Sequence, residues 1–307
     1  MMTMDDLVRK IEKLKKERGA VILAHNYQRP EVQDVADFVG DSLELSRKAA
    51  GTSAKVIVFC GVYFMAETAK ILSPKKTVLI PEEDAKCPMA AMIDASALRA
   101  LKVKHPNAKV VCYVNTTAEV KAECDVCCTS SNAVSVVAGI DAEEIIFVPD
   151  KYLAAYVEKE LKARGVHKRI IPWNGFCPTH VKIIPNYLRE LRLKYPSARI
   201  ITHPECTPDT NRESDAVLST SGMVKFVKET SADTVIVGTE VGMIHRFEKE
   251  APGKTYIPAT SLAVCPNMKM ITLEGVYESL RDMKYEVEVE KEVAKKALRA
   301  IDEMMKY

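Results

Sequence analysis

Short apolar runs alternate with polar, helix-like segments along the whole chain. The runs hold four to six mainly β-branched residues, whereas the intervening segments repeat apolar positions every three or four residues. The first strand-like runs are AVILAHNY from Ala20, KVIVFC from Lys55 and KTVLIP from Lys76. The helices expected between such runs include residues 5–18, 64–72, 154–163 and 187–194. Strands and helices that alternate in this way predict parallel sheets covered by helices.

The same set of elements occurs three times. His25, Tyr113 and His203 occupy one position of the first strand, at spacings of 88 and 90 residues. Other features recur at nearly the same period. They are one aspartate in each unit (Asp37, Asp125 and Asp215), a second strand (from Lys55, Glu143 and Asp233) and a third strand (from Lys76, Lys168 and Lys254) that leads into a Cys-Pro step (Cys87, Cys177 and Cys265). Four sets of elements at one period indicate an internal triplication.

The triplication predicts an α/β fold in which three homologous parallel-sheet units surround a central site with pseudo-threefold symmetry. We expect units at residues 1–91, 92–181 and 182–270, each with three strands and a cysteine loop. Residues 271–307 form a C-terminal extension, with a helix over 287–306 that packs back on the body. No Gly/Ser-rich linker separates the units, so they should pack tightly.

Polar residues gather at the carboxyl ends of the predicted first strands, where ligands bind in open α/β sheets. They are His25, Tyr27, Tyr113, Asn115, His203 and Glu205. Small polar residues also precede expected helix starts, where they can cap the helix or help to bind an anion: Ser42, Ser130, Ser219 and Thr220. Asp37, Asp125 and Asp215 are interpreted as turn or cap residues. The pattern predicts an anion-binding pocket on the axis.

Cysteines provide the candidate metal ligands. Only Cys87, Cys177 and Cys265 are followed by proline, and only these three occupy equivalent repeat positions. Three thiolates would hold an iron–sulfur cubane and leave one iron open as a Lewis acid. Zinc held by three cysteines and a water, or three buried structural cysteines, are the alternatives.

The other six cysteines have no equivalents in the repeats. Cys124 and Cys127 form a C-x-x-C pair, but the aligned positions of the other two units are not cysteine. Cys127 and Cys128 are therefore expected to be core residues or to lie behind the site. Cys60, Cys112 and Cys206 lie in or beside strands and should be buried.

Composition narrows the class of protein. Of 307 residues, 47% are hydrophobic and 28% charged, with a net charge of +2, which is typical of a folded protein without a general affinity for nucleic acids or membranes. No apolar stretch reaches the roughly 18 residues of a membrane span, and the N-terminus does not resemble a signal peptide. Nine cysteines, an odd number, favour a reducing compartment, so we expect a cytoplasmic location.

Ordered motifs along nearly the full length resemble the quinolinate synthase family. They are AHNYQ, GDSLELS, FCGVYFMAETAKIL, CYVNT, CTSSNA, GFCPTH, HPEC, STSGM, GTEVGM and CPNMK. The resemblance implies three α/β domains around one 4Fe–4S cluster with three cysteine ligands and one open iron. It also implies condensation of iminoaspartate with dihydroxyacetone phosphate to quinolinate, phosphate and water, a step of NAD biosynthesis.

The resemblance also assigns residues. It implies that Cys87, Cys177 and Cys265 bind the cluster, and that iminoaspartate is bound by His25, Ser42, Tyr113, Asn115, Ser130, His203, Glu205 and Thr220, with Ser219 beside it. On that basis Glu205 and Tyr27 are the candidates for proton transfer, and His203 would tune Glu205 or bind a carboxylate. An enzyme that supplies iminoaspartate is the expected partner. Another open-cluster hydro-lyase, a non-catalytic iron–sulfur carrier and a zinc-stabilised structural protein remain the alternatives.

Overall fold

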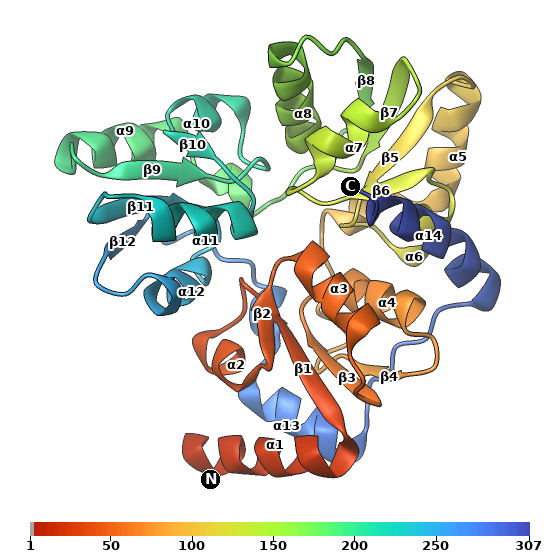
Figure 1. Ribbon diagram of the computed structural model, residues 1–307, viewed down its shortest axis with the longest axis vertical. Coiled ribbons are helices and arrows are strands. Elements are labelled where there is room, and N and C mark those ends of the chain that lie inside the picture. Colours follow the sequence, from red (N-terminus) through yellow and green to blue (C-terminus); the bar gives the residue numbers. More distant parts are fainter. Residues whose placement is uncertain (1–2) are drawn as a thin grey trace.

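The computed structural model describes residues 3–307 and contains three α/β lobes around a common centre (Figure 1). Each lobe has a four-stranded, all-parallel sheet. The strand orders are β2-β1-β3-β4, β6-β5-β7-β8 and β10-β9-β11-β12, which are the same order repeated. The predicted α/β fold with three similar units is therefore confirmed.

The strands of the three sheets fall at equivalent places in the repeats. They are β1 (Ala20–His25), β2 (Phe38–Gly40), β3 (Val56–Cys60) and β4 (Thr77–Leu79); β5 (Lys109–Tyr113), β6 (Val126–Cys128), β7 (Glu144–Val148) and β8 (Arg169–Pro172); and β9 (Arg199–Thr202), β10 (Ala216–Val217), β11 (Thr234–Gly238) and β12 (Thr255–Pro258). The inner strands are buried on both faces, as expected for parallel sheets covered by helices.

Helices connect the strands and cover the sheets. They are α1 (Met4–Arg18), α2 (Pro30–Val35), α3 (Ser42–Gly51), α4 (Tyr63–Leu72), α5 (Ala95–Lys104), α6 (Ala118–Ala122), α7 (Ala133–Gly139), α8 (Lys151–Ala163), α9 (Pro185–Lys194), α10 (Pro208–Arg212), α11 (Thr220–Glu229), α12 (Met243–Glu250), α13 (Leu273–Asp282) and α14 (Lys291–Met304). Within residues 3–307, no helix is both long and apolar enough to cross a membrane.

The expectation of three strands per unit was wrong, because each sheet has a fourth strand at its edge. β2, β6 and β10 contain only two or three residues, too few to show an alternating pattern. The repeated aspartates stand just before them and are neither plain turn residues nor helix caps. Their carboxylates accept hydrogen bonds from the first strand of each sheet, at Ile22, Val110 and Ile200, over 2.7, 2.8 and 2.7 Å. Each aspartate therefore fixes the edge strand against its neighbour.

The helix after each cysteine loop passes to the next unit around the axis. α5 precedes β5 of the second sheet, and α9 precedes β9 of the third. α13 follows the third cysteine loop and returns to the first unit, where it packs against α1 and β3 (Figure 1). α13, which belongs to the predicted C-terminal extension, thus closes the ring of three units.

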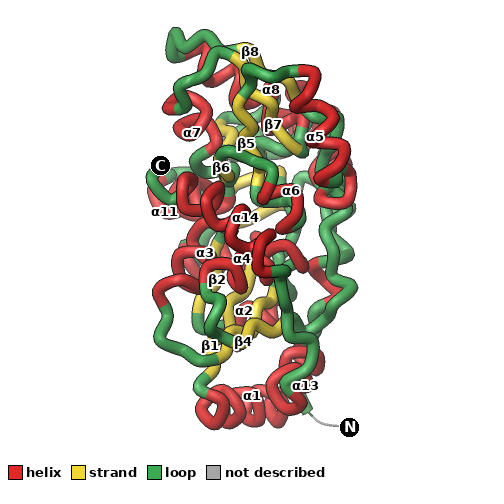
Figure 2. The backbone as a smooth tube through the Cα atoms, turned by 90° about the vertical axis from the view of Figure 1, so that its right-hand side faces the viewer, coloured by secondary structure: helices red, strands yellow, loops and turns green. Residues whose placement is uncertain are grey.

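The predicted C-terminal helix is present as α14, which begins at Lys291 rather than at residue 287. The Glu290 side chain caps it by accepting from two backbone N–H groups. Before α14 the chain runs beside β4, where Ile80 N donates to Tyr285 O over 3.1 Å. α14 then packs on α6 and β6 and also touches α4, so it joins the first and second units (Figure 2).

A carboxyl group is buried where these two units meet. Glu67 of α4 is 8% exposed, and its Oε2 accepts the Ala118 N–H at the start of α6 over 3.3 Å. Burial raises the pKa of Glu67 to about 7, although the Lys121 ammonium opposes this shift. The protonated form is therefore favoured in the folded protein.

This raised pKa predicts a loss of stability as the pH rises. The ordinary pKa is 4.5, so between about pH 4.5 and 7 the folded protein holds a proton that the unfolded chain has lost. Glu67→Gln retains an acceptor for Ala118 and should flatten the pH dependence in this range, by about 2 kcal/mol. Urea unfolding from pH 5 to 8, with the exposed Glu143→Gln as control, measures this. Equal slopes for wild type and Glu67→Gln would contradict the prediction.

Candidate active site

A single cavity at the centre of the molecule is lined by residues of all three units. It brings together nearly all the residues singled out in the sequence: His25, Tyr27, Ser42, Cys87, Tyr113, Asn115, Ser130, Cys177, His203, Glu205, Thr220 and Cys265. Ser219 is the exception, because its hydroxyl accepts the Gly222 N–H over 3.2 Å and caps α11. The next residue, Thr220, faces the cavity instead.

Helix starts place small hydroxyls at the cavity wall. Ser42 and Thr220 are the first residues of α3 and α11, and the caps of these helices are Asp41 and Ser219. In the second unit α7 begins later, after Asn132, so Ser130 precedes the helix. The expected pairs are therefore present, and in the first and third units the first residue of the pair caps the helix and the second lines the cavity, which Asp41 also borders.

The turns after β1 and β9 fix two histidine side chains in the same way. His25 Nδ1 accepts the Tyr27 N–H over 3.1 Å, and His203 Nδ1 accepts the Glu205 N–H over 3.2 Å. Burial lowers the pKa of both histidines to about 3, more than Glu205 raises it, so both rings are neutral. A neutral ring that accepts at Nδ1 carries its proton on Nε2.

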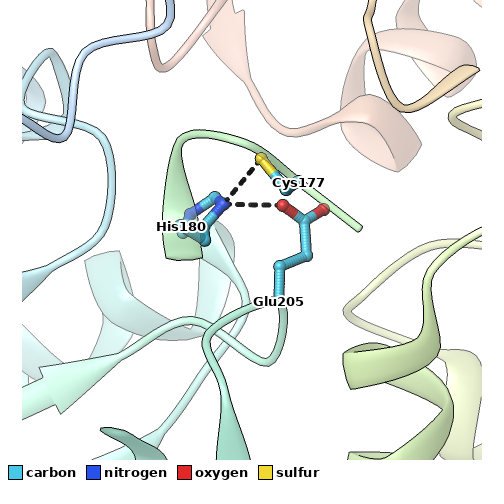
Figure 3. Close-up of side chains that lie close together, drawn as sticks. All are labelled: Cys177, His180 and Glu205. Carbon is cyan, nitrogen blue, oxygen red and sulfur yellow. Dashed lines mark hydrogen bonds and ion pairs between the residues drawn. The ribbon is translucent and has the colours of Figure 1, made fainter. Parts of the chain in front are cut away.

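A fully enclosed carboxylate stands at the centre of the site. Glu205 is 3% exposed, and its Oε1 accepts the Tyr113 hydroxyl over 2.5 Å. Its Oε2 lies 2.7 Å from His180 Nδ1 (Figure 3). Burial alone would raise the pKa of Glu205, but His180 and the Tyr113 hydroxyl, which both contact its carboxylate, outweigh burial and lower that pKa. Glu205 is therefore ionised and acts as an acceptor.

Hydrogen bonds continue from Glu205 to Tyr27 of the first unit. His180 Nε2 lies 2.8 Å from Thr239 Oγ1, which lies 2.7 Å from the Tyr27 hydroxyl. Burial, together with the charge of Glu205, raises the pKa of Tyr27, which keeps the phenol protonated. Every group has a partner if the Tyr27 hydroxyl donates to Thr239, the Thr239 hydroxyl donates to His180 Nε2, and His180 Nδ1–H donates to Glu205. This chain can pass a proton between Tyr27 and Glu205.

His180 and Thr239 were not singled out by the sequence analysis. Both residues could have been found in the sequence, because they differ from the residues at the equivalent positions of the other units. His180 is the third residue after Cys177, and the other units have Ala90 and Met268 at that position. Thr239 follows β11 where the first unit has Gly61. A polar residue at one of three equivalent positions marks a role at the site rather than in the common scaffold.

The three Cys-Pro cysteines share the cavity and are partly exposed, whereas the other six are buried. Each is followed by a short turn: η1 (Ala90–Met92), η2 (His180–Lys182) and η3 (Met268–Met270). Backbone N–H groups at this turn donate hydrogen bonds to each cysteine sulfur, for example the His180 N–H to Cys177. Burial, with a smaller contribution from Cys265, raises the pKa of Cys87 to about 12. Crowded thiols with N–H donors around them suit a cationic group that binds three thiolates.

A second candidate metal site overlaps the first. Cys177, His180 and Glu205 offer ligand atoms within 4.8 Å of one another, and no other such group of three occurs in residues 3–307 (Figure 3). Sulfur, imidazole and carboxylate ligands suit a single zinc ion. This set shares only Cys177 with the three-cysteine set, so a metal analysis can separate the two.

The remaining cysteines are buried, as predicted for those other than Cys124. Cys127 and Cys128 have no exposed surface and Cys124 is 6% exposed. Cys112 contacts the Thr116 hydroxyl over 2.9 Å, and Cys124 donates to the Val120 carbonyl over 3.0 Å. Cys60, Cys112 and Cys206 are also fully buried. These six side chains belong to the core.

A buried ion pair ties the third cysteine loop to the first unit. Glu240 has no exposed surface, and its carboxylate accepts the N–H groups of Cys265 and Gly242 over 3.1 and 2.6 Å. Lys269 lies 3.1 Å from this carboxylate and also donates to the Tyr27 carbonyl. The pair therefore sets the position of Cys265 relative to Tyr27.

Comparisons with known proteins point to one family. The family model described as quinolinate synthetase A protein matches residues 9–306. The chain is 53% identical to "Quinolinate synthase 1" of Methanosarcina acetivorans over 304 residues, which are 99% of this chain and 98% of that protein. It is 53% identical to the quinolinate synthase of Dehalococcoides mccartyi (97% of each chain) and 48% identical to that of Alkaliphilus metalliredigens (99% of each chain).

The buried pair yields a stability prediction. Lys269→Met leaves Glu240 buried without a counter-charge and should lower the free energy of unfolding by about 3 kcal/mol. Adding Glu240→Gln should recover more than half of this loss, because the charge is then gone. Lys249→Met, which removes an exposed pair with Asp34, is the control and should cost less than about 1 kcal/mol. Urea unfolding measures all four proteins, and a double variant no more stable than Lys269→Met would contradict the account.

Proposed function

The chain belongs to the quinolinate synthase family and is an enzyme, and we propose that it condenses iminoaspartate with dihydroxyacetone phosphate to quinolinate, phosphate and water. The observation that carries the proposal is the cavity that joins three cysteine loops to the hydrogen-bonded chain between Tyr27 and Glu205. The reaction requires proton transfers and the loss of water, and the cavity offers groups for both.

We propose that Cys87, Cys177 and Cys265 hold one 4Fe–4S cluster with one open iron. Their equivalent positions, shared cavity and N–H donors support this assignment. When bound, such a cluster supplies a Lewis acid that polarises a substrate oxygen and helps hydroxide to leave.

We assign the binding of a doubly charged substrate to polar protein groups around the cavity. The hydroxyls of Ser42, Ser130 and Thr220 and the Asn115 amide can donate to carboxylates, as can a neutral His25 through Nε2, whereas Nε2 of His203 faces the Ser130 hydroxyl. All six line the cavity. Since these donors come from all three units, the substrate would be held across the pseudo-threefold axis.

Proton transfer is assigned to Glu205 and Tyr27. The ionised Glu205 can accept a proton, and the protonated Tyr27 can donate one. His180 and Thr239 lie between them and link the two groups by hydrogen bonds. His203 orients the turn through its bond with the Glu205 N–H, which supports its role in tuning Glu205.

A cytoplasmic location and a partner enzyme that supplies iminoaspartate are also proposed. All nine cysteines are free thiols, which suits a reducing compartment. The partner follows from the substrate, because an imine of this kind hydrolyses in water and must be made close to its point of use.

The proposal is tested by assaying protein purified without oxygen, with iminoaspartate and dihydroxyacetone phosphate as substrates. Wild type should form quinolinate and phosphate in equal amounts. Glu205→Gln should retain its iron yet turn over at least ~100-fold more slowly, because the acceptor for the proton is lost. The exposed Glu190→Gln serves as control and should match wild type. Full activity of Glu205→Gln would remove Glu205 from the mechanism, and absence of quinolinate with wild type would remove the function.

The cysteine ligands are tested separately by metal content. Replacing Cys87, Cys177 or Cys265 with serine should abolish most of the bound iron and sulfide, since each supplies one of three thiolates. Cys60→Ala, which removes a buried thiol of β3, should leave the iron content unchanged. A normal iron content in one of the three serine variants would exclude that cysteine as a ligand.

A further inference from the structure

Asn26 stands between His25 and Tyr27, yet it lies behind the cavity wall rather than in it. It is 1% exposed, and its Nδ2 donates to Thr220 Oγ1 over 3.0 Å, a contact between the first and third units. The equivalent positions of the other units hold Val114 and Pro204. The amide is thus not required by the common scaffold.

The surroundings of Asn26 fix its backbone firmly. Its N–H donates to the Gly40 carbonyl over 3.1 Å, and its carbonyl accepts from Gln33 Nε2 over 3.2 Å. Its side-chain Oδ1 has no protein partner within residues 3–307, whereas Nδ2 is directed at Thr220. The amide therefore acts on Thr220 as a donor.

The hydrogen bond from Asn26 determines which further hydrogen bond the Thr220 hydroxyl can make. A hydroxyl that accepts one hydrogen bond at oxygen still has its own proton to give. Thr220 is 3% exposed and lines the cavity, so the remaining direction for that proton is toward a bound ligand. A hydroxyl held in this way selects an acceptor, such as an anionic oxygen.

The boundary between the third and second units repeats the arrangement with different residues. His203 Nε2 lies 3.3 Å from Ser130 Oγ, and its Nδ1 is occupied by the Glu205 N–H. The proton on Nε2 therefore points at the serine oxygen, and the serine proton is free for the cavity. At two of the three boundaries, a buried donor thus turns a hydroxyl toward the ligand.

We propose that Asn26 is a positioning residue that holds the Thr220 hydroxyl as a hydrogen-bond donor to an anionic oxygen of the ligand. The inference rests on the proposed function for the identity of that ligand, whose carboxylates and phosphate both supply such an oxygen. Asn26 touches no substrate and acts only through Thr220. It contributes to the preference of the site for anions.

The direction of this hydrogen bond is tested with two substitutions of similar size. Asn26→Asp offers only acceptors and would draw the Thr220 proton away from the ligand, whereas Asn26→Leu offers neither donor nor acceptor. Calorimetric titration of the full-length protein with quinolinate, and separately with inorganic phosphate, should rank the affinities as wild type, then Asn26→Leu, then Asn26→Asp. The last should bind at least one of the two anions about tenfold or more weakly. The anion that shows the ranking identifies a carboxylate or a phosphate as the acceptor.

The negative charge of Asn26→Asp needs its own control. In a Thr220→Val background the charge is the same but the hydroxyl is absent, so Asn26→Asp should weaken binding by clearly less than in the presence of Thr220. An equal penalty in both backgrounds would overturn the proposal, as would wild-type affinity of Asn26→Asp for both anions.

Binding and turnover separate this inference from the proposed function. A wild type that makes no quinolinate but shows the ranking with either anion would leave the inference standing. A wild type that makes quinolinate but shows no ranking would overturn the inference alone. If wild type bound neither anion, the inference would be overturned as well. Asn26→Leu keeps the test valid where Asn26→Asp is too unstable to titrate.

Discussion

A carboxylate buried at the junction of three units constrains the whole structure. An unpaired charge in a protein interior costs several kcal/mol, so Glu205 must have partners wherever the fold encloses it. Its partners are Tyr113 from the second sheet and His180 from the second cysteine loop, and His203 lies beside it. The units therefore have to close around Glu205 for its charge to be satisfied, and the same closure creates the cavity.

Threefold repetition supplies the scaffold and three equivalent cysteines, and departures from it supply polar contacts between the units. The repeated aspartates fix edge strands, and the repeated cysteines face one cavity. His180, Thr239 and Asn26 each occupy one of three equivalent positions where the other units lack a matching polar group. Each of these residues makes a hydrogen bond that crosses from one unit to another. The hydrogen-bonded chain from Tyr27 to Glu205 depends on two of these asymmetric residues, Thr239 and His180.

Much of this arrangement could be predicted from the sequence because the repeat period aligns equivalent residues of the three units. The inner strands, the cysteine loops and the polar strand ends all follow from that period. The edge strands β2, β6 and β10 could not, since two or three residues carry no pattern. The return of α13 to the first unit depends on tertiary packing. The contact between Asn26 and Thr220 spans 194 residues, and its hydrogen-bond direction depends on neighbours that no local motif reveals.

The central claim is that three equivalent loops meet to bind one metal centre beside the Glu205 chain. Iron and acid-labile sulfide content, with a visible spectrum, tests it most directly on protein purified without oxygen. The account predicts about four irons and four sulfides per chain, and a broad brown absorption that is lost in air. A colourless protein with one zinc per chain would contradict it.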